Sequence, residues 1–113
     1  MAREISDQLL AAEGLRRGMV LVIFPEGGRS LEGNVREFRR GAAILARNLG
    51  VPIAPVGIWG AYQVWPREGR FRRHPMALDF GAALSPDQSP SEEALIRVLR
   101  DEVIRLVAAA EHL

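Results

Sequence analysis

The residues from Phe24 to Ser30, with the sequence Phe-Pro-Glu-Gly-Gly-Arg-Ser, combine groups that could bind an anion. Gly27 and Gly28 allow the backbone to approach a ligand closely, and backbone N–H groups in such a turn can hydrogen-bond a phosphate. Arg29 adds a guanidinium, which matches phosphate geometry with paired hydrogen bonds. Glu26 would repel the anion, so we expect it to orient an arginine or to hydrogen-bond a ligand hydroxyl. The pattern is equally compatible with an ordinary turn that carries surface charges.

A buried strand is expected to lead into this loop. Six apolar residues from Met19 to Phe24 precede it without a polar interruption. Such a run is typical of a strand that is buried on both faces in a parallel sheet. Before the strand, apolar residues at helical spacing predict a helix that Gly18 closes; they are Leu9, Leu10, Ala11, Ala12 and Leu15.

The segments after the loop alternate between helix and strand. Residues 38–49 return to helical spacing, with Gly50 as the stop. Residues 51–58 indicate a second apolar strand, which Pro52 and Pro55 make irregular or edge-lying. A strand, a helix and a strand in this order predict a right-handed parallel crossover.

Two further elements complete the expected fold. Met76 to Phe80 indicates a third strand, and Ser89-Pro90-Ser91-Glu92 has the pattern of a capping box, with Ser89 as the N-cap, that opens a helix through Leu106 or beyond. The fold class is therefore α/β, with a partial, mostly parallel sheet and flanking helices, in a single domain of residues 1–113. Core packing explains the apolar face of the last helix better than membrane binding does; this face carries Leu95, Val98, Leu99, Val103, Leu106 and Val107.

Composition narrows the function classes. The chain has 113 residues, 48% of them apolar, which suffices for one domain with a buried core. It has no cysteine, which excludes disulfides, thiolate metal sites and thiol catalysis. A net charge of +1 gives no support for a nucleic-acid partner. No apolar stretch approaches the ~20 residues that span a bilayer, and residues 1–4 do not lead into a signal peptide. A cytoplasmic location fits these features.

Several blocks of the sequence resemble, in the same order, those of the glycerol-phosphate and lysophosphatidic acid acyltransferases. Phe24 to Ser30 is similar to the family's F-P-E-G-T-R-S block, Phe38 to Gly41 to its F-K-x-G block, and Val51 to Val56 to its V-P-I-x-P-V block. Gly60 to Pro66 resembles the segment that usually follows, and Phe80-Gly81 resembles the late strand end. Blocks in the right order are far more specific than any single block.

The resemblance covers roughly residues 6–110 and includes two departures. Gly28 replaces the usual Thr and removes a hydroxyl that could contact the acceptor, whereas Arg39 replaces Lys and keeps the charge. The resemblance implies acyl transfer from a thioester, either acyl-CoA or acyl-carrier protein, to a glycerol-phosphate or lysophospholipid acceptor in phospholipid biosynthesis. It implies no metal and no cofactor besides that co-substrate.

The same resemblance assigns the candidate site residues. The acceptor would be bound by the loop residues Glu26, Gly27, Gly28, Arg29 and Ser30, and the wall of the site would be supported by Pro52, Pro55 and Val56. Lipid substrates make a peripheral contact with the inner face of the membrane reasonable for a cytoplasmic protein of this kind.

The catalytic base of that family is expected outside these blocks. The family carries a block H-x-x-x-x-D upstream of F-P-E-G, and the resemblance implies that its His deprotonates the acceptor hydroxyl while its Asp orients the His. The residues before Phe24 contain no histidine, so we expect this chain to be the C-terminal, acceptor-binding half and to hold no catalytic residue. Two alternatives stay open: a non-catalytic remnant that binds phospholipid or lysophospholipid, and a half that is active only with an upstream partner segment. Missing neighbours would also leave an exposed sheet edge that promotes self-association.

A second H-x-x-x-x-D pattern, from His74 to Asp79, is rejected as the catalytic pair. It follows the acceptor loop instead of preceding it. Five positions of separation along a strand span ~16 Å and place the two side chains on opposite faces. We expect a loop histidine before a strand and an exposed Asp79.

Aromatic and basic residues are interleaved after the second strand. Such a mixture suits an anionic bilayer surface, but it also fits Trp side chains that fill the core beneath a rim of solvated Arg. The second interpretation is slightly favoured because the cluster is short and Glu68 interrupts it. The residues concerned are Trp59, Tyr62, Trp65, Phe71, Arg67, Arg70, Arg72 and Arg73.

Overall fold

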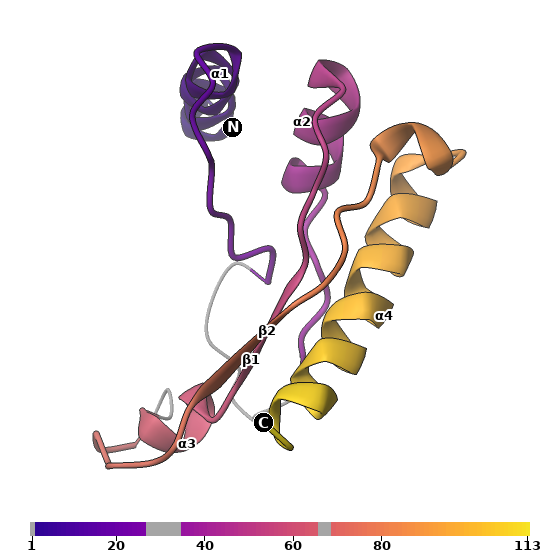
Figure 1. Ribbon diagram of the computed structural model, residues 1–113. Helices are drawn as coiled ribbons and strands as arrows, with labels where there is room; N and C mark the ends of the chain where they lie inside the picture. Colours follow the sequence, from indigo (N-terminus) through magenta and orange to yellow (C-terminus); the bar gives the residue numbers. More distant parts are fainter. Residues whose placement is uncertain (1, 27–34, 66–68) are drawn as a thin grey trace.

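In the computed structural model the C-terminal helix lies along a narrow two-stranded sheet, and the N-terminal helix lies at one end of the molecule (Figure 1). The structure describes residues 2–26, 35–65 and 69–113, and for residues 2–8 the backbone alone. In these residues the elements are helices α1 (Ala2–Arg16), α2 (Gly41–Leu49), α3 (Ala61–Val64) and α4 (Glu92–Ala110), strands β1 (Val56–Trp59) and β2 (Ala77–Phe80), and a 3₁₀ turn at Pro86–Gln88.

The described sheet is antiparallel. Strand β1 pairs with β2 in a register that places Gly57 opposite Asp79 and Ile58 opposite Leu78. An isolated antiparallel bridge between Ile53 and Leu84 continues the same ribbon. The expected parallel pairing is therefore wrong for these residues. The chain reverses direction between the two strands, in the connection that includes α3, so neighbouring strands run in opposite directions.

The apolar run from Met19 to Phe24 is not a buried strand. Val20 is 89% exposed and Phe24 is 71% exposed. Among the described residues, the only backbone hydrogen bond of this run joins the Met19 N–H to the Gly14 carbonyl at 3.0 Å. A parallel strand needs neighbours that satisfy its backbone groups, and β1 pairs with β2 instead of with this segment. The expectation of a strand buried on both faces is corrected accordingly.

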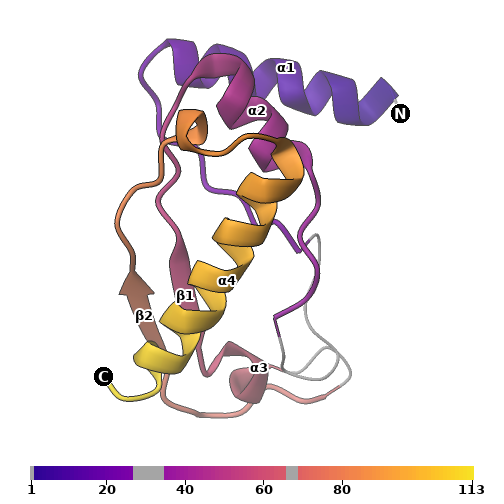
Figure 2. The ribbon, with the colours of Figure 1, turned by 90° about the vertical axis from the view of Figure 1, so that its right-hand side faces the viewer.

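Helix α4 covers one face of the sheet, as Figures 1 and 2 both show. At Gly57 the contact is so close that a Cβ atom would lie 2.5 Å from the backbone carbon of Leu106 and 2.5 Å from the backbone nitrogen of Val107. Only glycine fits such an approach of strand to helix. The opposite face of the sheet is apolar and exposed at Ile58 and Leu78, which face each other across the ribbon.

A small apolar core lies where α2 meets the first half of α4. Ala43, Leu95 and Leu99 are buried there. Leu95 and Leu99 are separated by about one turn of α4, so both side chains lie on the same face of that helix. The part-buried side chains packed against this core are Phe38, Ile53, Leu84 and Ile96.

Helices α1 and α2 end at the expected glycines, but the N-cap of the last helix lies two residues after the expected one. Gly18 and Gly50 adopt the left-handed conformation just after α1 and α2, with φ of 83° and 66°. Helix α4 is capped by Ser91, whose hydroxyl accepts the Ala94 N–H at 3.1 Å. Ser89 was expected as the cap, but its N–H bonds the Pro86 carbonyl and closes the preceding 3₁₀ turn.

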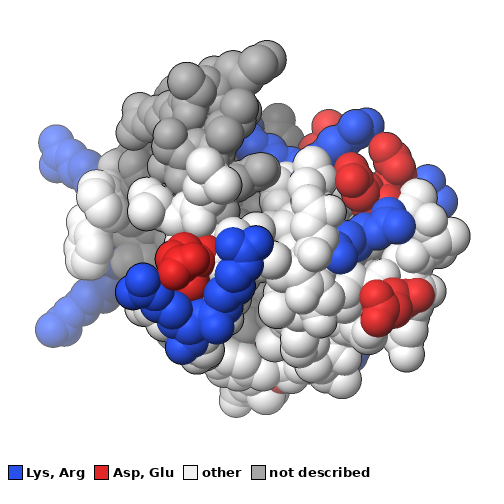
Figure 3. Space-filling view, turned by 90° about the horizontal axis from the view of Figure 1, so that it is seen from above, with Lys and Arg blue, Asp and Glu red and all other residues white. Residues whose placement is uncertain are grey.

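Acidic and basic side chains are interspersed on the end of the molecule seen from above (Figure 3). Two of the ion pairs in the described chain are Arg17 with Glu13 at 2.9 Å and Arg40 with Glu93 at 3.2 Å. No helix that the structure describes has the length and apolarity needed to cross a bilayer.

Candidate functional site

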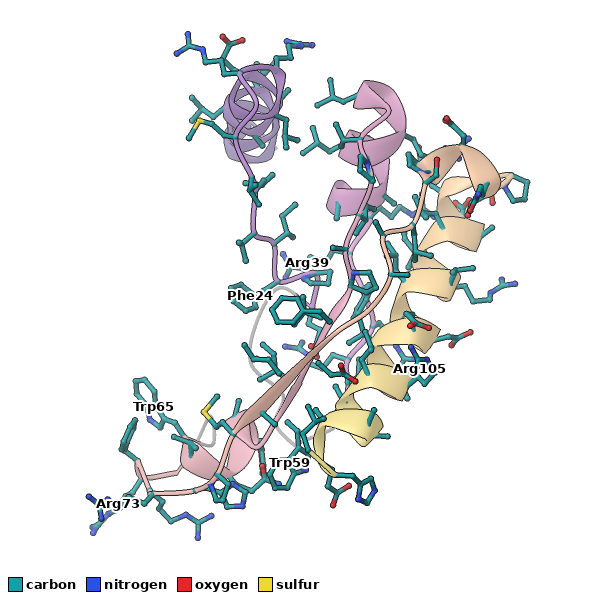
Figure 4. All side chains as sticks on the ribbon, viewed as in Figure 1. Phe24, Arg39, Trp59, Trp65, Arg73 and Arg105 are labelled. Atoms are coloured by element: carbon teal, nitrogen blue, oxygen red, sulfur yellow. The ribbon has the colours of Figure 1, made fainter. Side chains whose placement is uncertain are left out.

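The segment before the predicted acceptor loop lies beside the segment after it. The Arg39 N–H donates a hydrogen bond to the Pro25 carbonyl at 2.8 Å. Figure 4 shows Phe24 and Arg39 close together in the middle of the molecule, on different stretches of chain. Phe38, the neighbour of Arg39, packs against the core. Within the Phe38–Gly41 block, Phe38 thus attaches the segment after the loop to the core, and Arg39 bonds this segment to Pro25.

Glu26 forms a second tie between the same two segments. Its Oε2 accepts a hydrogen bond from the backbone N–H of Arg36 at 2.7 Å. A bond from a backbone N–H to a carboxylate is charge-assisted and stronger than a neutral one. Glu26 was expected to orient an arginine side chain or to meet a ligand hydroxyl; in the structure its partner is a backbone amide on the far side of the loop. The sequence distance of ten residues makes this a loop-closing contact.

Arg100 on α4 supports the returning segment from a third direction. Its Nε donates to the Arg36 carbonyl at 3.1 Å, and its Nη2 donates to the Val35 carbonyl at 3.0 Å. The Arg100 guanidinium therefore bonds two consecutive backbone carbonyls, because its N–H donors lie in one plane and point in fixed directions. Sequence reasoning missed Arg100 because its partners lie 64 and 65 positions away and no local spacing points to it.

We call this set of contacts the loop clasp; it consists of Pro25, Glu26, Val35, Arg36, Arg39 and Arg100. The clasp joins residues 25–26 to residues 35–39, and residues 27–34 between them lie outside the described residues. Gly27, Gly28, Arg29 and Ser30 fall in that range, so their assignment to acceptor binding stays a prediction. The structure does place the residues on both sides of them in one locality.

The predicted site wall consists of the first residue of β1 and of residues just before that strand. Pro55 is buried, and its carbonyl accepts the Gly81 N–H at 2.9 Å. Val56 is half-buried opposite Phe80, and Pro52 is exposed. These contacts give Pro55 and Val56 a role in the ribbon; their contact with a ligand stays a prediction.

A shallow groove adjoins the clasp and shares Arg100 with it. The groove has a volume of about 370 Å³, and within it Arg40 pairs with Glu93. Its charges are mixed, because Glu37 and Arg97 also line it. The groove therefore offers no concentration of positive charge that would select an anion.

His74 and Asp79 make no hydrogen bond with each other in the described chain. The His74 Nδ1 lies 2.7 Å from the Pro75 carbonyl, and its ring packs on Trp59 with centroids 5.3 Å apart. Asp79 is half-buried opposite Gly57, not exposed as expected. The pair therefore lacks the contact that orients a catalytic histidine.

The clear pKa shifts in the described residues belong to a surface pair on α4. A hydrogen bond from Arg105 lowers the pKa of Glu102 below its usual range, and the same pair raises the pKa of Arg105. The two residues lie three positions apart on the helix, where such pairs stabilise the helix itself. Neither residue belongs to the loop clasp.

Part of the chain matches a known protein family. The family described as Acyltransferase matches residues 3–59, a range that includes all of the clasp except Arg100. A crystal structure of the 1-acyl-sn-glycerophosphate (LPA) acyltransferase PlsC from Thermotoga maritima superposes with a TM-score of 0.83 and 34% identity. The match covers 92% of this chain and 44% of that one, and it confirms the α/β class.

Curated relatives match a part of this chain. A 1-acyl-sn-glycerol-3-phosphate acyltransferase from Pseudomonas aeruginosa is 42% identical over 57 residues, which are 50% of this chain and 22% of that protein. A probable 1-acyl-sn-glycerol-3-phosphate acyltransferase from Mycoplasma genitalium is 36% identical over 73 residues, or 64% of this chain and 27% of that protein. The aligned region thus spans about a quarter of the length of these relatives.

Proposed function

Because the chain belongs to the Acyltransferase family, we propose that it supplies the acceptor-binding half in acyl transfer from a thioester to a glycerol phosphate or lysophospholipid during phospholipid biosynthesis. The loop clasp is the observation that carries this proposal. It holds Glu26 and Arg36 together across the loop that contains Arg29. A loop whose two ends are fixed can present backbone N–H groups and a guanidinium at a small cost in conformational entropy when an anion binds.

Each loop residue has a distinct part in the proposal. Arg29 binds the acceptor phosphate with paired hydrogen bonds. Gly27 and Gly28 let the backbone approach the ligand, and Ser30 completes the acceptor contacts. Glu26 holds the loop through Arg36.

The reaction needs a base that the clasp does not contain. The acceptor hydroxyl oxygen bonds to the acyl carbonyl carbon, the carbon–sulfur bond of the donor breaks, and the donor leaves as a thiol, either CoA or acyl-carrier protein. The hydroxyl proton passes to a general base and from there to the sulfur of the leaving group. The chain has two histidines, of which His74 bonds Pro75 and His112 lies next to the last residue. We therefore assign the base to a segment other than those that form the clasp.

This arrangement also favours a second candidate function. A chain with an acceptor loop and no base beside it could bind phospholipid or lysophospholipid without turnover. Addition of a partner segment with an H-x-x-x-x-D block separates the two candidates. Turnover in its presence supports the transferase half, and binding without turnover supports the binding protein.

We place the protein in the cytoplasm, in peripheral contact with the inner face of the membrane, where lysophospholipid acceptors lie. Self-association is also proposed. The apolar segment Met19–Phe24 and the bare sheet face at Ile58 and Leu78 are the surfaces available for it.

Titration of the chain with glycerol 3-phosphate and with inorganic phosphate tests the acceptor site. We expect weak binding, and Arg29→Ala should weaken it roughly 10- to 100-fold, since a charge-assisted contact contributes on the order of 1.5–3 kcal/mol. Arg29→Lys should recover only part of the loss, because an ammonium lacks the planar fork. Arg47→Ala, an exposed arginine on α2, is the matched control. If both Arg29 variants bind as the wild type does, the loop is a structural turn and the proposal fails.

A further inference from the structure

The connection between β1 and β2 forms the end of the molecule opposite α1 (Figures 1 and 2). We call its described residues, 60–65 and 69–76, the hairpin tip. Gly60 begins the tip with a φ of 93°, and a Cβ atom there would lie 2.1 Å from the Pro75 carbonyl oxygen. The two stems of the tip are therefore packed closely together. A backbone hydrogen bond from Arg72 to the Val64 carbonyl, at 2.7 Å, joins them further out.

Large apolar side chains of the tip face solvent. Phe71 is 72% exposed and Trp65 is 53% exposed, and their rings contact each other edge to face with centroids 6.0 Å apart. Met76 is also exposed. The sequence slightly favoured a core role for the Trp residues; Trp59 is half-buried against His74, but Trp65 is not part of the core. Exposed aromatic pairs of this kind mark interaction surfaces.

Basic side chains surround this apolar group. Arg70, Arg72 and Arg73 are exposed, and none of them forms an ion pair in the part of the chain that the structure describes. The described tip residues include no aspartate or glutamate. By contrast, Arg17 and Arg40 elsewhere on the surface each pair with a glutamate. Among the described residues of the tip, the positive charge of these arginines thus has no acidic partner.

The apolar and basic groups meet in a shallow hollow of about 530 Å³. Its lining combines Val64, Phe71 and Met76 with Arg72 and Arg73. Figure 4 shows Trp65 and Arg73 projecting from this end of the molecule, away from α4. The surface therefore presents apolar and cationic groups side by side at a protruding end.

We propose that the hairpin tip is the surface through which the protein docks on an anionic phospholipid bilayer, with Trp65, Phe71 and Met76 in the interface. Arg70, Arg72 and Arg73 then meet the lipid phosphates. Aromatic rings favour the level of the headgroups, and basic side chains are attracted by the negative surface potential. Charge complementarity selects the bilayer as the occupant, because arginines that form no ion pair among the described residues lie beside the side chains that would enter the apolar boundary. This inference rests on the peripheral membrane contact proposed above and assigns it to particular residues.

Binding to vesicles of phosphatidylcholine alone and of phosphatidylcholine mixed with phosphatidylglycerol provides the test. We expect co-sedimentation with the anionic vesicles that decreases as salt is added. The Arg72→Gln/Arg73→Gln variant should lose about fivefold in affinity for each arginine removed. Arg16→Gln/Arg47→Gln removes the same charge from α1 and α2 and should bind as the wild type does. Equal losses in the two double variants would overturn the assignment to the tip.

A fluorescence measurement reports on the tip directly. In a Trp59→Phe background Trp65 is the only tryptophan, and its emission should shift to shorter wavelength and be quenched by brominated lipid when vesicles bind. Phe71→Leu should keep most of the affinity, whereas Phe71→Ser should lose it. Unchanged Trp65 emission during binding, or binding of a single-stranded oligonucleotide in place of vesicles, would refute the proposal. Glycerol 3-phosphate affinity should not change in the tip variants, so failure of the acceptor site and failure of the tip are separate results.

Discussion

The carboxylate of Glu26 and the backbone N–H of Arg36 lie within a hydrogen bond of 2.7 Å, across the loop that separates them in sequence. The same Arg36 residue offers its carbonyl to Arg100 on α4. Arg36 is thus bonded both to Glu26, before the loop, and to Arg100 on α4. This relationship places Glu26 in the framework of the loop and explains how a carboxylate can lie in a segment that we propose to bind an anion.

Replacement of Glu26 should distinguish a framework role from direct ligand contact. Glu26→Gln keeps an acceptor oxygen but loses the charge-assisted bond to Arg36, so we expect a roughly 3- to 10-fold loss of affinity. If Glu26 holds the loop, glycerol 3-phosphate and inorganic phosphate should lose affinity equally. Selective loss of glycerol 3-phosphate binding in the titration would instead identify a contact with the glycerol hydroxyl. Tighter binding of both ligands would show that Glu26 only repels the anion.

Arg100 should act on the acceptor loop from a distance. Arg100→Gln removes the fork that binds the Val35 and Arg36 carbonyls and should weaken glycerol 3-phosphate binding roughly 3- to 10-fold. Arg100→Lys should recover only part of this loss, because the lysine ammonium lacks the planar fork that bonds both carbonyls. Arg97→Gln changes an exposed arginine of the same helix and serves as the control. The NMR spectra also include the backbone amide resonance of Arg36. Its chemical shift should differ from that of the wild type in both Arg100 variants before ligand is added. An unchanged chemical shift would contradict the loop clasp.

The contact between the sheet and α4 should not tolerate a side chain at Gly57. The new Cβ of Gly57→Ala would lie 2.5 Å from backbone atoms of Leu106 and Val107. The helix would have to move, and overpacking of this kind costs about 1–3 kcal/mol of the free energy of unfolding. Gly14→Ala is the control, since its Cβ would lie 3.7 Å from the Met19 sulfur, an ordinary contact. Urea denaturation should show a lower midpoint for Gly57→Ala alone; equal midpoints would mean that α4 does not pack as described.

The chain by itself should not catalyse acyl transfer. A general base contributes typically ~10²–10⁴-fold to such a reaction, and the described residues place no histidine in the clasp. The assay is release of CoA from acyl-CoA that depends on added lysophospholipid. Robust release would contradict the expectation, and His74→Ala would then show whether His74 is the base.

The exposed apolar run should promote association between chains. Val22 lies in the Met19–Phe24 segment and is exposed. An apolar segment that pairs with no strand among the described residues can pair with a second chain. Sedimentation velocity at tens of micromolar should show species larger than a monomer. Val22→Lys should shift them towards the monomer, whereas Val98→Lys, at an exposed valine on α4, should not. A clean monomer in the wild type would exclude this surface as a site of self-association.

Several elements could be predicted because their signals are local. Gly18 and Gly50 end helices, since glycine adopts the left-handed conformation without a Cβ clash. The strand expected at Met76–Phe80 is present as Ala77–Phe80, and the last helix begins within three residues of its expected cap. Periodicity and capping involve neighbours a few positions apart, so the order of residues carries them directly.

Other features depend on which distant segments meet. Met19–Phe24 has the composition of a buried strand, yet its burial requires neighbours that β1 and β2 do not provide. The antiparallel direction of the sheet follows from the reversal between β1 and β2, and apolar composition alone does not distinguish it from parallel pairing. The exposure of Trp65 likewise depends on the shape of the hairpin tip.

The sequence by itself determined the three longer helices, the glycine stops of α1 and α2, the α/β class and the ordered blocks that carry the family resemblance. The tertiary structure decided the direction of strand pairing and the close approach of Gly57 to α4. It also decided the partners of Glu26 and Arg100. The reason is physical: helix signals act over one or two turns of chain, whereas Arg100 bonds carbonyls 64 and 65 positions away. Such a contact exists only after α4 has packed against the rest of the fold.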